Sequence, residues 1–581
     1  MRLQVIKSKN AASFYAIKTV YKDGKQKTII VEKLGTYASL LEKLNGEDPY
    51  EWAKKRVEEL NRQEQECKLA DVQFSLSPNK KIKSGEKRLF NAGFLFLSQI
   101  YKQLGLGQLC KKISKNYKFK YNLDSILSRL IYSRIIYPDS KLATYELSKK
   151  FIEQPDFDLH QIYRALDVLA KESDLIQSTV YENSIKITPR DTRVLFYDCT
   201  NFYFEMEREA GIKQYGYSKE HRPNPIVQMG LFMDGNGIPL AFCINPGNTN
   251  EQTTMRPLEK KIINDFGLSK FIVCTDAGLA SEDNRRFNTK GERAFITTQS
   301  IKKLKSFLQE WCLDNDGWSL SGSTKTYSLT DIDEDKYKEA IFYKERWINE
   351  NGFEQKLIVT YSIKYRDYMR TIRERQINRA EKLINANSDK LRKASATDCK
   401  RFINQINCTK SGEIAEKSTY SLDYEAIENE SKYDGFYGVC TNIQDETCEI
   451  IKINKKRWEI EECFRIMKTE FKSRPVYLSN DERIKAHFLT CYLALLIFRL
   501  LERKLGYKFT CEEIIDTLRN YNFLRPGPQG YIPAYTSNNI TTEIHNQFGF
   551  RTDYEIVTQD MLKEIKKINN LRKTLRKSTK I

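Results

Sequence analysis

The chain has 581 residues, of which 40% are hydrophobic, so it can bury several cores and is not generally disordered. Lysine and arginine outnumber aspartate and glutamate by 96 to 77, and the net charge of +19 favours a polyanionic partner such as nucleic acid. An AT-rich genome that encodes lysine freely would produce the same excess.

Cysteines and histidines argue against several classes of protein. The thirteen cysteines form no CxxC pair, which predicts buried, reduced thiols in a cytoplasmic protein. Only four histidines are present and none lies near a cysteine pair, so zinc is not expected. The first residues lack a signal peptide, and the apolar stretch from Phe488 to Leu501 is interrupted by Arg499. We expect a buried core helix there and no membrane partner.

The N-terminal third predicts three segments. Alternating residues on both sides of Asp23-Gly24 predict a β-hairpin, and a charged helix follows at about Pro49 to Lys68, which together make a unit of residues 1–68. Residues 69–88 are polar and lysine-rich and are typical of a linker. Residues 89–185 have helical periodicity and predict an α-helical domain, for which DNA docking and simple packing are equally good explanations.

The pattern changes at residue 192 to an α/β arrangement. The order of strand, strand, strand, helix, strand predicts a ribonuclease-H-like mixed sheet, whose first part is residues 192–300. The expected strands are 193–198, 226–233, 239–245, 271–275 and 294–298, and the expected helix is about 253–266.

The sheet is predicted to be interrupted. Residues 301–445 are too long for one crossover helix and predict an insertion subdomain, after which residues 446–510 complete the catalytic core and 511–581 form a helical region with a basic tail. Within the insertion we expect strands near 325–329, 339–345, 356–363 and 436–441 and a charged helix from about 366 to 394.

Three carboxylates stand out as candidate catalytic residues and metal ligands. Asp198 and Asp276 each end an apolar run, and Glu461 lies in a helical pattern. Carboxylates at strand ends can hold two Mg²⁺ ions, for which Mn²⁺ can substitute, and such a pair cleaves phosphodiesters. Asp198 is expected to bridge both ions from a central strand. The ordinary alternatives are an aspartate that caps a turn and a glutamate in a surface charge ladder.

Cations near these carboxylates are candidate DNA-binding residues. Arg457 and Lys468 share one helical stripe with Glu461, while Ile460 and Cys463 belong to the adjoining apolar stripe that would seat the helix on the sheet. Lys219 and Arg222 are further candidates, and ordinary solvated cations are an equally good explanation for them.

These motifs together resemble the DDE transposases of bacterial insertion sequences, in the IS-four-like group. That group carries Y-x2-R-x3-E-x6-K around its glutamate, and Arg457, Glu461 and Lys468 match it, while Asn454 stands in the tyrosine position. Asp198-Cys199-Thr200 resembles the family's D-x-T. Further matches are Asp276 to Ser281 with D-A-G-x-x-S, Gly216 to Pro223 with G-x-S-K-x-x-R-P, and Pro246 to Glu251 with P-G-N-x-x-E.

The resemblance implies a function. Such enzymes bind inverted-repeat ends of double-stranded DNA, usually as a homodimer, hydrolyse the ends with divalent metal and join the exposed 3′-hydroxyls to target DNA. It implies that Asp198, Asp276 and Glu461 hold metal and that Arg457 and Lys468 grip phosphates near the scissile bond.

Two other functions fit the same residues. One is a ribonuclease-H-like nuclease without strand transfer, against which the long insertion and the N-terminal segments argue. The other is a non-catalytic DNA-binding protein descended from a transposase, against which the presence of all three carboxylates argues. Inverted repeats around the gene would separate the first from a transposase, and a magnesium-dependent cleavage assay would separate the second.

Overall fold

The computed structural model describes residues 1–8, 11–22, 25–44, 47–68, 74, 76–350, 352–386, 398–408 and 414–570. The chain forms two compact units. The first is Met1–Glu86 with Pro526–Gly530, and the second is Lys87–Arg525 with Tyr531–Ile581. Every candidate site residue belongs to the second unit.

The first unit is a small three-stranded sheet with two helices. Strands β1, β2 and β3 pair antiparallel in that order, and the β2–β3 pair is the hairpin expected from the sequence, whereas β1 was not predicted. The predicted Asp23-Gly24 turn and residues 69–73 of the predicted linker lie outside the described residues. The elements are β1 Arg2–Ser8, β2 Ala11–Lys22, β3 Lys25–Thr36, α1 Tyr37–Lys43 and α2 Pro49–Lys68.

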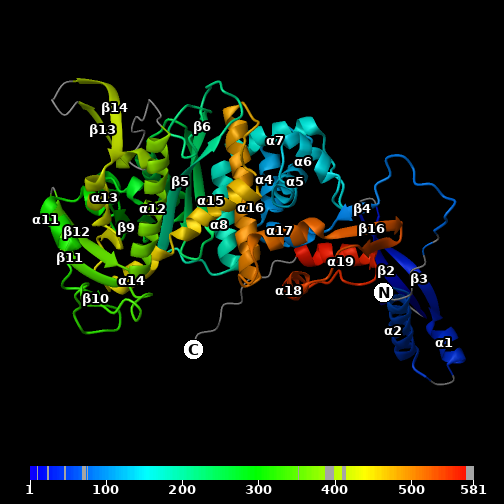
Figure 1. Cartoon of the computed structure of the whole chain (residues 1–581). Helices are drawn as coiled ribbons and strands as arrows, with labels where there is room; N and C mark the ends of the chain where they lie inside the picture. Colours follow the sequence, from blue (N-terminus) through cyan, green and yellow to red (C-terminus); the bar gives the residue numbers. More distant parts are fainter. Residues whose placement is uncertain are drawn as a thin grey trace. The chain divides into compact units, whose positions relative to one another are not determined.

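A nine-stranded mixed sheet organises the second unit (Figure 1), in the order β10-β11-β12-β15-β9-β8-β5-β6-β7. The first three strands in sequence form an antiparallel meander, and the next two run parallel to the strand that begins it. This arrangement is consistent with the predicted ribonuclease-H-like fold. These strands are β5 Val194–Tyr203, β6 Ile226–Asp234, β7 Pro239–Pro246, β8 Ile272–Thr275 and β9 Ala294–Gln299.

The two faces of the sheet belong to different cores. Leu195 and Tyr197 of β5 pack in a core with helix α9, Met255–Phe266. Phe196 and Phe202 pack in the large core on the opposite face. Because side chains alternate along a strand, every even-numbered position of β5, including 198, lies on the face of the large core.

Helix α16, Asp481–Lys504, is the centre of the large core. It packs against α3, α5 and α7 and against β7, so the helices of 89–185 share one core with the sheet. Figure 1 shows α16 running between the sheet and these helices. The helix is long and apolar enough to cross a membrane, but 94% of its most apolar stretch is buried inside the protein, which fits the expected core helix.

The helices before the sheet begin after a short strand, and their bounds differ little from the predicted segment. The elements are β4 Leu89–Asn91, α3 Phe94–Gln103, α4 Leu106–Lys115, α5 Leu123–Ile136, α6 Lys141–Ser148, α7 Leu159–Lys171 and α8 Ser173–Ile187.

The segment predicted as an insertion extends the sheet. Strand β15 pairs with β9, and β12 and β11 follow it outward, while the other side of these strands has its own core around Trp318 and Leu357. The predicted strand at 325–329 is wrong. Tyr327 forms only a single bridge to Trp318, because its ring packs edge-on against Phe342 and the chain around it turns instead of pairing.

The elements from α10 to α15 cover the insertion and the segments that flank it. Within the insertion, α11, β10, β13, β14 and α13 were not predicted. Helix α12 ends before the predicted position, and residues 387–394 of that prediction lie outside the described residues. The elements are α10 Glu282–Phe287, α11 Ser306–Leu313, β10 Ser319–Leu320, β11 Phe342–Glu350, β12 Phe353–Tyr361, α12 Ile363–Asn385, β13 Ile403–Cys408, β14 Ile414–Leu422, α13 Tyr424–Ser431, β15 Phe436–Thr441, α14 Thr447–Lys455 and α15 Trp458–Arg465.

The C-terminal region contains strands as well as the expected helices. Its strands form a second sheet of order β18-β17-β16-β4, in which β16 pairs antiparallel with β4. The predicted basic tail lies outside the described residues from 571 onward. The elements are α17 Cys511–Asn520, β16 Asn522–Gly527, β17 Gly530–Pro533, α18 Asn539–Phe548, β18 Val557–Thr558 and α19 Gln559–Asn570.

A buried ion pair stabilises the turn between β6 and β7. Asp234 is fully buried, pairs with Arg190 and accepts hydrogen bonds from the backbone N–H groups of Asn236 and Ile238, both at 3.0 Å. Replacing Asp234 with alanine should lower the free energy of unfolding by about 3–5 kcal/mol, because Arg190 would stay buried without a counter-charge.

Chemical denaturation would measure this loss. Asp191→Ala is the control, since Asp191 pairs with Arg193, whose side chain is 87% exposed, and should cost under about 1 kcal/mol. Equal losses in the two variants would contradict the assignment of the buried pair.

Candidate active site

Asp198 lies in the middle of a strand and not at its end as expected. Strand β5 continues to Tyr203 because β6 pairs with it along its whole length, with Asp198 opposite Leu231. On the other side the parallel pairing with β8 ends at Phe196 and Cys274. Asp198 therefore stands just past the last parallel pair, where the edge facing β8 opens.

Asp276 directly follows β8, as predicted. It caps a short helical turn, Ala277–Leu279, and its Oδ1 accepts a hydrogen bond from the Leu279 N–H at 3.1 Å. Phe196 pairs with Cys274, so Asp198 and Asp276 are each two residues further along adjacent strands. Neighbouring strands are about 4.8 Å apart, and the register therefore brings these two carboxylates together.

Asp198 lies in an environment that favours its protonated form. Burial raises the pKa of Asp198 to about 6, Lys219 opposes this rise, and the neighbouring negative charge of Asp276 adds to it. The Asp198 Oδ1 also accepts a hydrogen bond from the Cys199 N–H at 2.8 Å. A divalent cation between the two carboxylates would remove their repulsion, so the pair fits the oxygen-rich site that Mg²⁺ requires.

Glu461 lies on helix α15, which sits on the same face of the sheet. The buried side chains Ile460 and Cys463 seat the helix against the large core that Asp198 faces. The Glu461 side chain is 58% exposed, and its Oε1 lies 3.3 Å from a guanidinium nitrogen of Arg457. The structure confirms that Ile460 and Cys463 are buried, whereas Phe464, which the predicted stripe of Glu461 also contained, is buried with them and Lys468 lies beyond the end of α15.

Arg457 lies within electrostatic range of all three carboxylates. Burial by itself lowers the pKa of this guanidinium, but the charges of Tyr437, Glu461, Asp276 and Asp198 outweigh burial and raise it. Among the described residues, no three histidine, cysteine, aspartate or glutamate side chains lie close enough to hold a metal ion in this conformation. The strand register thus places the two aspartates on adjacent strands, while Glu461 contacts Arg457.

Lys468 and Lys219 also reach this site. Lys468 lies in a π-helical turn, Ile466–Glu470, of the kind often found at functional sites, and its Nζ is 5.6 Å from the centre of the Phe202 ring. Lys219 donates a hydrogen bond to the carbonyl of Cys199 at 2.8 Å and pairs with Glu251 at 3.3 Å. Both amines interact with the charge of Asp198.

Arg222 has partners other than the aspartates. Its guanidinium stacks over the Tyr203 ring at 4.2 Å and lies 3.6 Å from Glu220. Glu220 also pairs with Lys468 at 3.8 Å and with Arg474. Neither Glu220 nor Arg474 was predicted from the sequence as a residue of this site.

Asn454, at the position of the family tyrosine, packs against the aspartate-bearing strand. Its Oδ1 accepts a hydrogen bond from the Cys274 thiol at 3.7 Å, two residues before Asp276.

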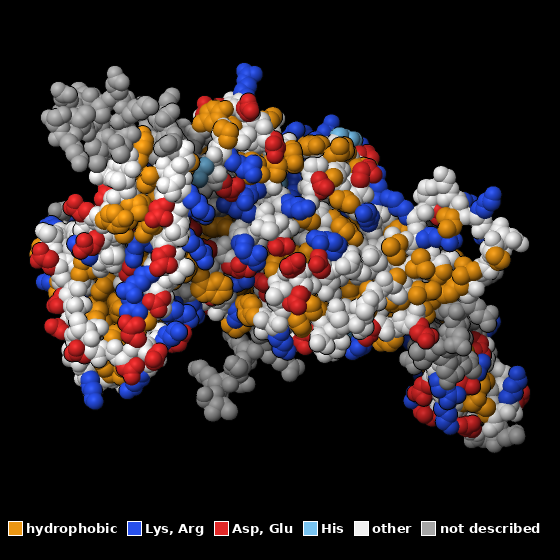
Figure 2. Space-filling view, in the orientation of Figure 1, with side chains coloured by type: hydrophobic (Ala, Val, Ile, Leu, Met, Phe, Trp, Pro, Cys, Tyr) orange, Lys and Arg blue, Asp and Glu red, His pale blue; other side chains and the backbone are white. Residues whose placement is uncertain are grey.

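On the face drawn in Figure 2, basic and acidic side chains are interspersed, and basic side chains gather over the middle of the molecule, where Figure 1 places α15 and α16.

Comparisons with known proteins show the family of this chain. Residues 189–497 match the model of the family described as "Transposase DDE domain". No curated protein matches the chain. Among solved structures, the chain is similar to a piggyBac transposase in a synaptic complex with hairpin DNA, with 7% identity and a TM-score of 0.35 over 84% of this chain and 85% of that one. Because this TM-score is below 0.5, that similarity supports no statement about the fold or function of this chain. The family match spans more than half of the chain, includes all three carboxylates, and shows that this protein is a member of the DDE transposase family.

Proposed function

We propose that this transposase cleaves double-stranded DNA at the inverted-repeat ends of an insertion sequence and joins the exposed 3′-hydroxyls to target DNA. Asp198, Asp276 and Glu461 would hold two magnesium ions. The observation that supports this proposal most is the register of β5 and β8, which brings a buried aspartate and a second aspartate together beside the glutamate helix.

Each carboxylate would have a separate task. When bound, divalent ions would supply Lewis-acid activation of water and relief of charge on the leaving oxygen. Asp198 would be the shared ligand, since it stands between the charges of Asp276, Lys219 and Arg457. Glu461 is exposed on its helix and would turn from Arg457 towards the aspartates to complete the site.

The cations would position the DNA. Arg457 would exchange its contact with Glu461 for a phosphate near the scissile bond, and Lys468 and Lys219 would bind phosphates on the other side of Asp198. Arg222 would act further out, beside Tyr203. Phosphate contacts of this kind fix the register of the DNA and carry no sequence information.

The proposal includes an assembly. Two DNA ends must be processed together, so we expect a homodimer in the DNA complex, as the resemblance to the IS-four-like transposases implies. Its mass in the presence of end-containing duplex DNA, measured by light scattering, would show two protein chains.

One experiment tests the reaction. Purified protein is incubated with Mg²⁺ and duplex DNA that carries the inverted repeats flanking its gene, together with a supercoiled target plasmid. The proposal expects nicked ends and joined products. Cleavage without joining would make the protein a nuclease, and binding without cleavage would make it a non-catalytic descendant of a transposase.

DNA binding should depend on pH through Lys468. Burial and the charge of Lys219, opposed by the charge of Asp198, lower the pKa of this amine to about 8. A bound phosphate favours the charged amine, so DNA affinity should fall as the pH rises through 8, by up to about tenfold at pH 9 for one titrating group.

Fluorescence anisotropy without divalent ions would measure this dependence. Lys468→Arg provides the control, because a guanidinium stays charged over this range and should flatten the profile. A profile that is the same in the variant and the wild type would contradict the role of Lys468.

A further inference from the structure

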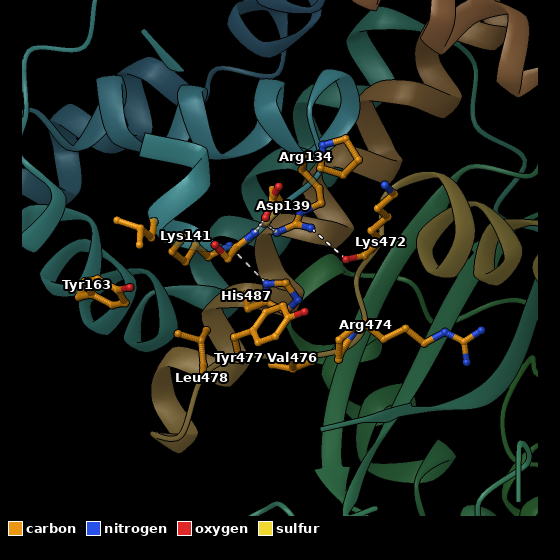
Figure 3. Close-up of a pocket in the computed structure, with 14 residues that line it drawn as sticks. Arg134, Asp139, Lys141, Tyr163, Lys472, Arg474, Val476, Tyr477, Leu478 and His487 are labelled. Atoms are coloured by element: carbon orange, nitrogen blue, oxygen red, sulfur yellow. Dashed lines mark hydrogen bonds between the residues drawn. The ribbon is translucent and has the colours of Figure 1, made fainter. Parts of the chain in front are cut away.

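A cavity of about 670 Å³ lies next to the segment that follows the Glu461 helix in the chain. Its walls come from α5, α6, α7 and α16 and from the segment 472–478 that follows the π-helical turn. The volume is in the range of pockets that hold small ligands. Figure 3 shows Arg134, Lys141 and His487 converging in the centre of this pocket, while Arg474 extends away towards the strands.

Lys141 is a buried amine with unused hydrogen-bonding capacity. Its side chain lines the cavity although the residue is only 5% exposed, and its Nζ lies 3.3 Å from His487 Nδ1. His487 Nε2 lies 3.1 Å from the Ser473 carbonyl, which can only accept, so Nε2 carries the proton and Nδ1 accepts from Lys141. Two of the three ammonium N–H groups have no hydrogen-bond partner among the described residues.

Arg134 is a second buried cation in the same wall. Its terminal nitrogens donate to the carbonyls of Phe471 at 2.9 Å and Asp139 at 3.0 Å, which holds the two loops of the cavity in place. Its Nε is buried and has no hydrogen-bond partner in the described part of the chain. The cavity wall therefore contains an unpartnered donor next to the unused N–H groups of Lys141.

The lining of the cavity has a large excess of positive charge. Arg134, Lys141 and Lys472 line it together with one carboxylate, Asp139, whose Oδ1 accepts a hydrogen bond from the Ser140 N–H at 2.6 Å, while the Arg474 guanidinium extends away and pairs with Glu220. Within the described residues, neither buried cation forms an ion pair. Burial, together with the charge of Arg134, lowers the pKa of Lys141 to about 7. Such a buried cation costs stability, and a bound anion would offset that cost.

We propose that this cavity binds a phosphate group of the DNA backbone, with Lys141 as its principal ligand. The cavity adjoins the end of the catalytic strand, since the Val476 N–H donates to the Tyr203 carbonyl at 3.3 Å. Tyr203 is five residues beyond Asp198 on β5, a distance of roughly 17 Å along an extended strand. The bound phosphate lies a few nucleotides from the scissile one, and this inference rests on the proposed function for its ligand class.

The salt dependence of DNA binding tests this site. Binding of a random-sequence duplex to the full chain is measured without divalent ions, at salt concentrations from about 50 to about 300 mM. Lys141→Gln keeps an N–H donor for His487 and removes the charge. It should reduce the slope of log K against log salt by about 0.9, the value for one phosphate contact. Its melting temperature should equal or exceed that of the wild type.

A matched control and a second variant make the result decisive. Lys563→Gln removes an exposed lysine that already pairs with Asp560 on α19, and it should leave the slope unchanged. Leu142→Trp adds bulk at an exposed position of the lining, 56% accessible, without touching a buried group, and should reduce the slope as Lys141→Gln does. If Lys141→Gln does not fold, Leu142→Trp decides alone.

Each further outcome has one meaning. An unchanged slope in the folded variants overturns the proposal. If inorganic phosphate raises the melting temperature of the wild type while the slopes stay equal, the cavity takes free phosphate and the assignment to DNA is overturned. Because this binding is measured without metal, failure of Mg²⁺-dependent cleavage by the wild type would bear on the proposed function alone.

Discussion

Replacing Asp198 or Asp276 with asparagine should reduce DNA cleavage by about a thousandfold or more, since losing a metal ligand removes several kcal/mol of transition-state stabilisation. The two residues stand in register on adjacent parallel strands, and the neutral amide of asparagine is a poor ligand for a divalent cation. DNA binding should persist, because the phosphate contacts are made by cations. Cleavage would be followed on end-containing duplex DNA with Mg²⁺, and binding by anisotropy with Ca²⁺.

Asp283→Asn is the matched control for these two variants. Asp283 lies on α10, a few residues after Asp276, and its side chain is 71% exposed and pairs with Arg256 at 3.3 Å. A surface change of this kind alters free energies by less than about 0.5 kcal/mol, so cleavage should change by no more than about twofold. Cleavage at the wild-type rate by either Asp198→Asn or Asp276→Asn would remove that residue from the site. Titration with Mn²⁺ should show that Asp198→Asn and Asp276→Asn each bind the metal more weakly than the wild type.

The second large effect is expected at Glu461. Glu461→Gln keeps the size of the side chain and its ability to face Arg457, but the neutral amide is a poor ligand for a divalent cation. Cleavage should again fall by about a thousandfold, a loss of roughly 4 kcal/mol. Single-turnover cleavage at saturating DNA is the measurement, because it separates the chemical step from binding.

Glu462 offers a control one residue away on the same helix. Its carboxylate pairs with Arg465 at 2.7 Å and is not among the charges that act on Arg457 or Asp198. Glu462→Gln should therefore cleave DNA at close to the wild-type rate. Similar losses in the two variants would mean that the helix needs its overall charge, and Glu461 would then not be a metal ligand.

Much of the fold could be predicted from local pattern. The apolar runs before Asp198 and Asp276 predicted their strands, because a strand buried on both faces is apolar throughout. The end of β5 was missed, since Thr200 and Asn201 look like a turn and form a strand only because β6 pairs with them. The strand β1 and the strands of the C-terminal region were missed for the same reason, as pairing partners distant in sequence determine short strands.

The residues of the candidate site were also predictable from the sequence only in part. Residue type and spacing made Asp198, Asp276, Glu461, Arg457 and Lys468 candidates, because metal and phosphate chemistry requires carboxylates and cations. Glu220 and Arg474 could not be recognised, since the contact between them depends on how the segment after the π-helical turn returns to β5. Lys141 and His487 are 346 residues apart and meet only through the packing of α6 against α16.

The sequence by itself determined the chemistry available to this protein: its basic charge, its three acidic motifs and the division of α15 into a charged and an apolar stripe. These depend on residue type and on the periods of helix and strand, which are local properties. Only the tertiary structure decided which carboxylates come together, that the insertion extends the catalytic sheet, and that buried cations line a cavity beside it. Burial, register and the charge around a titrating group arise from segments far apart in the chain, and local sequence does not specify them.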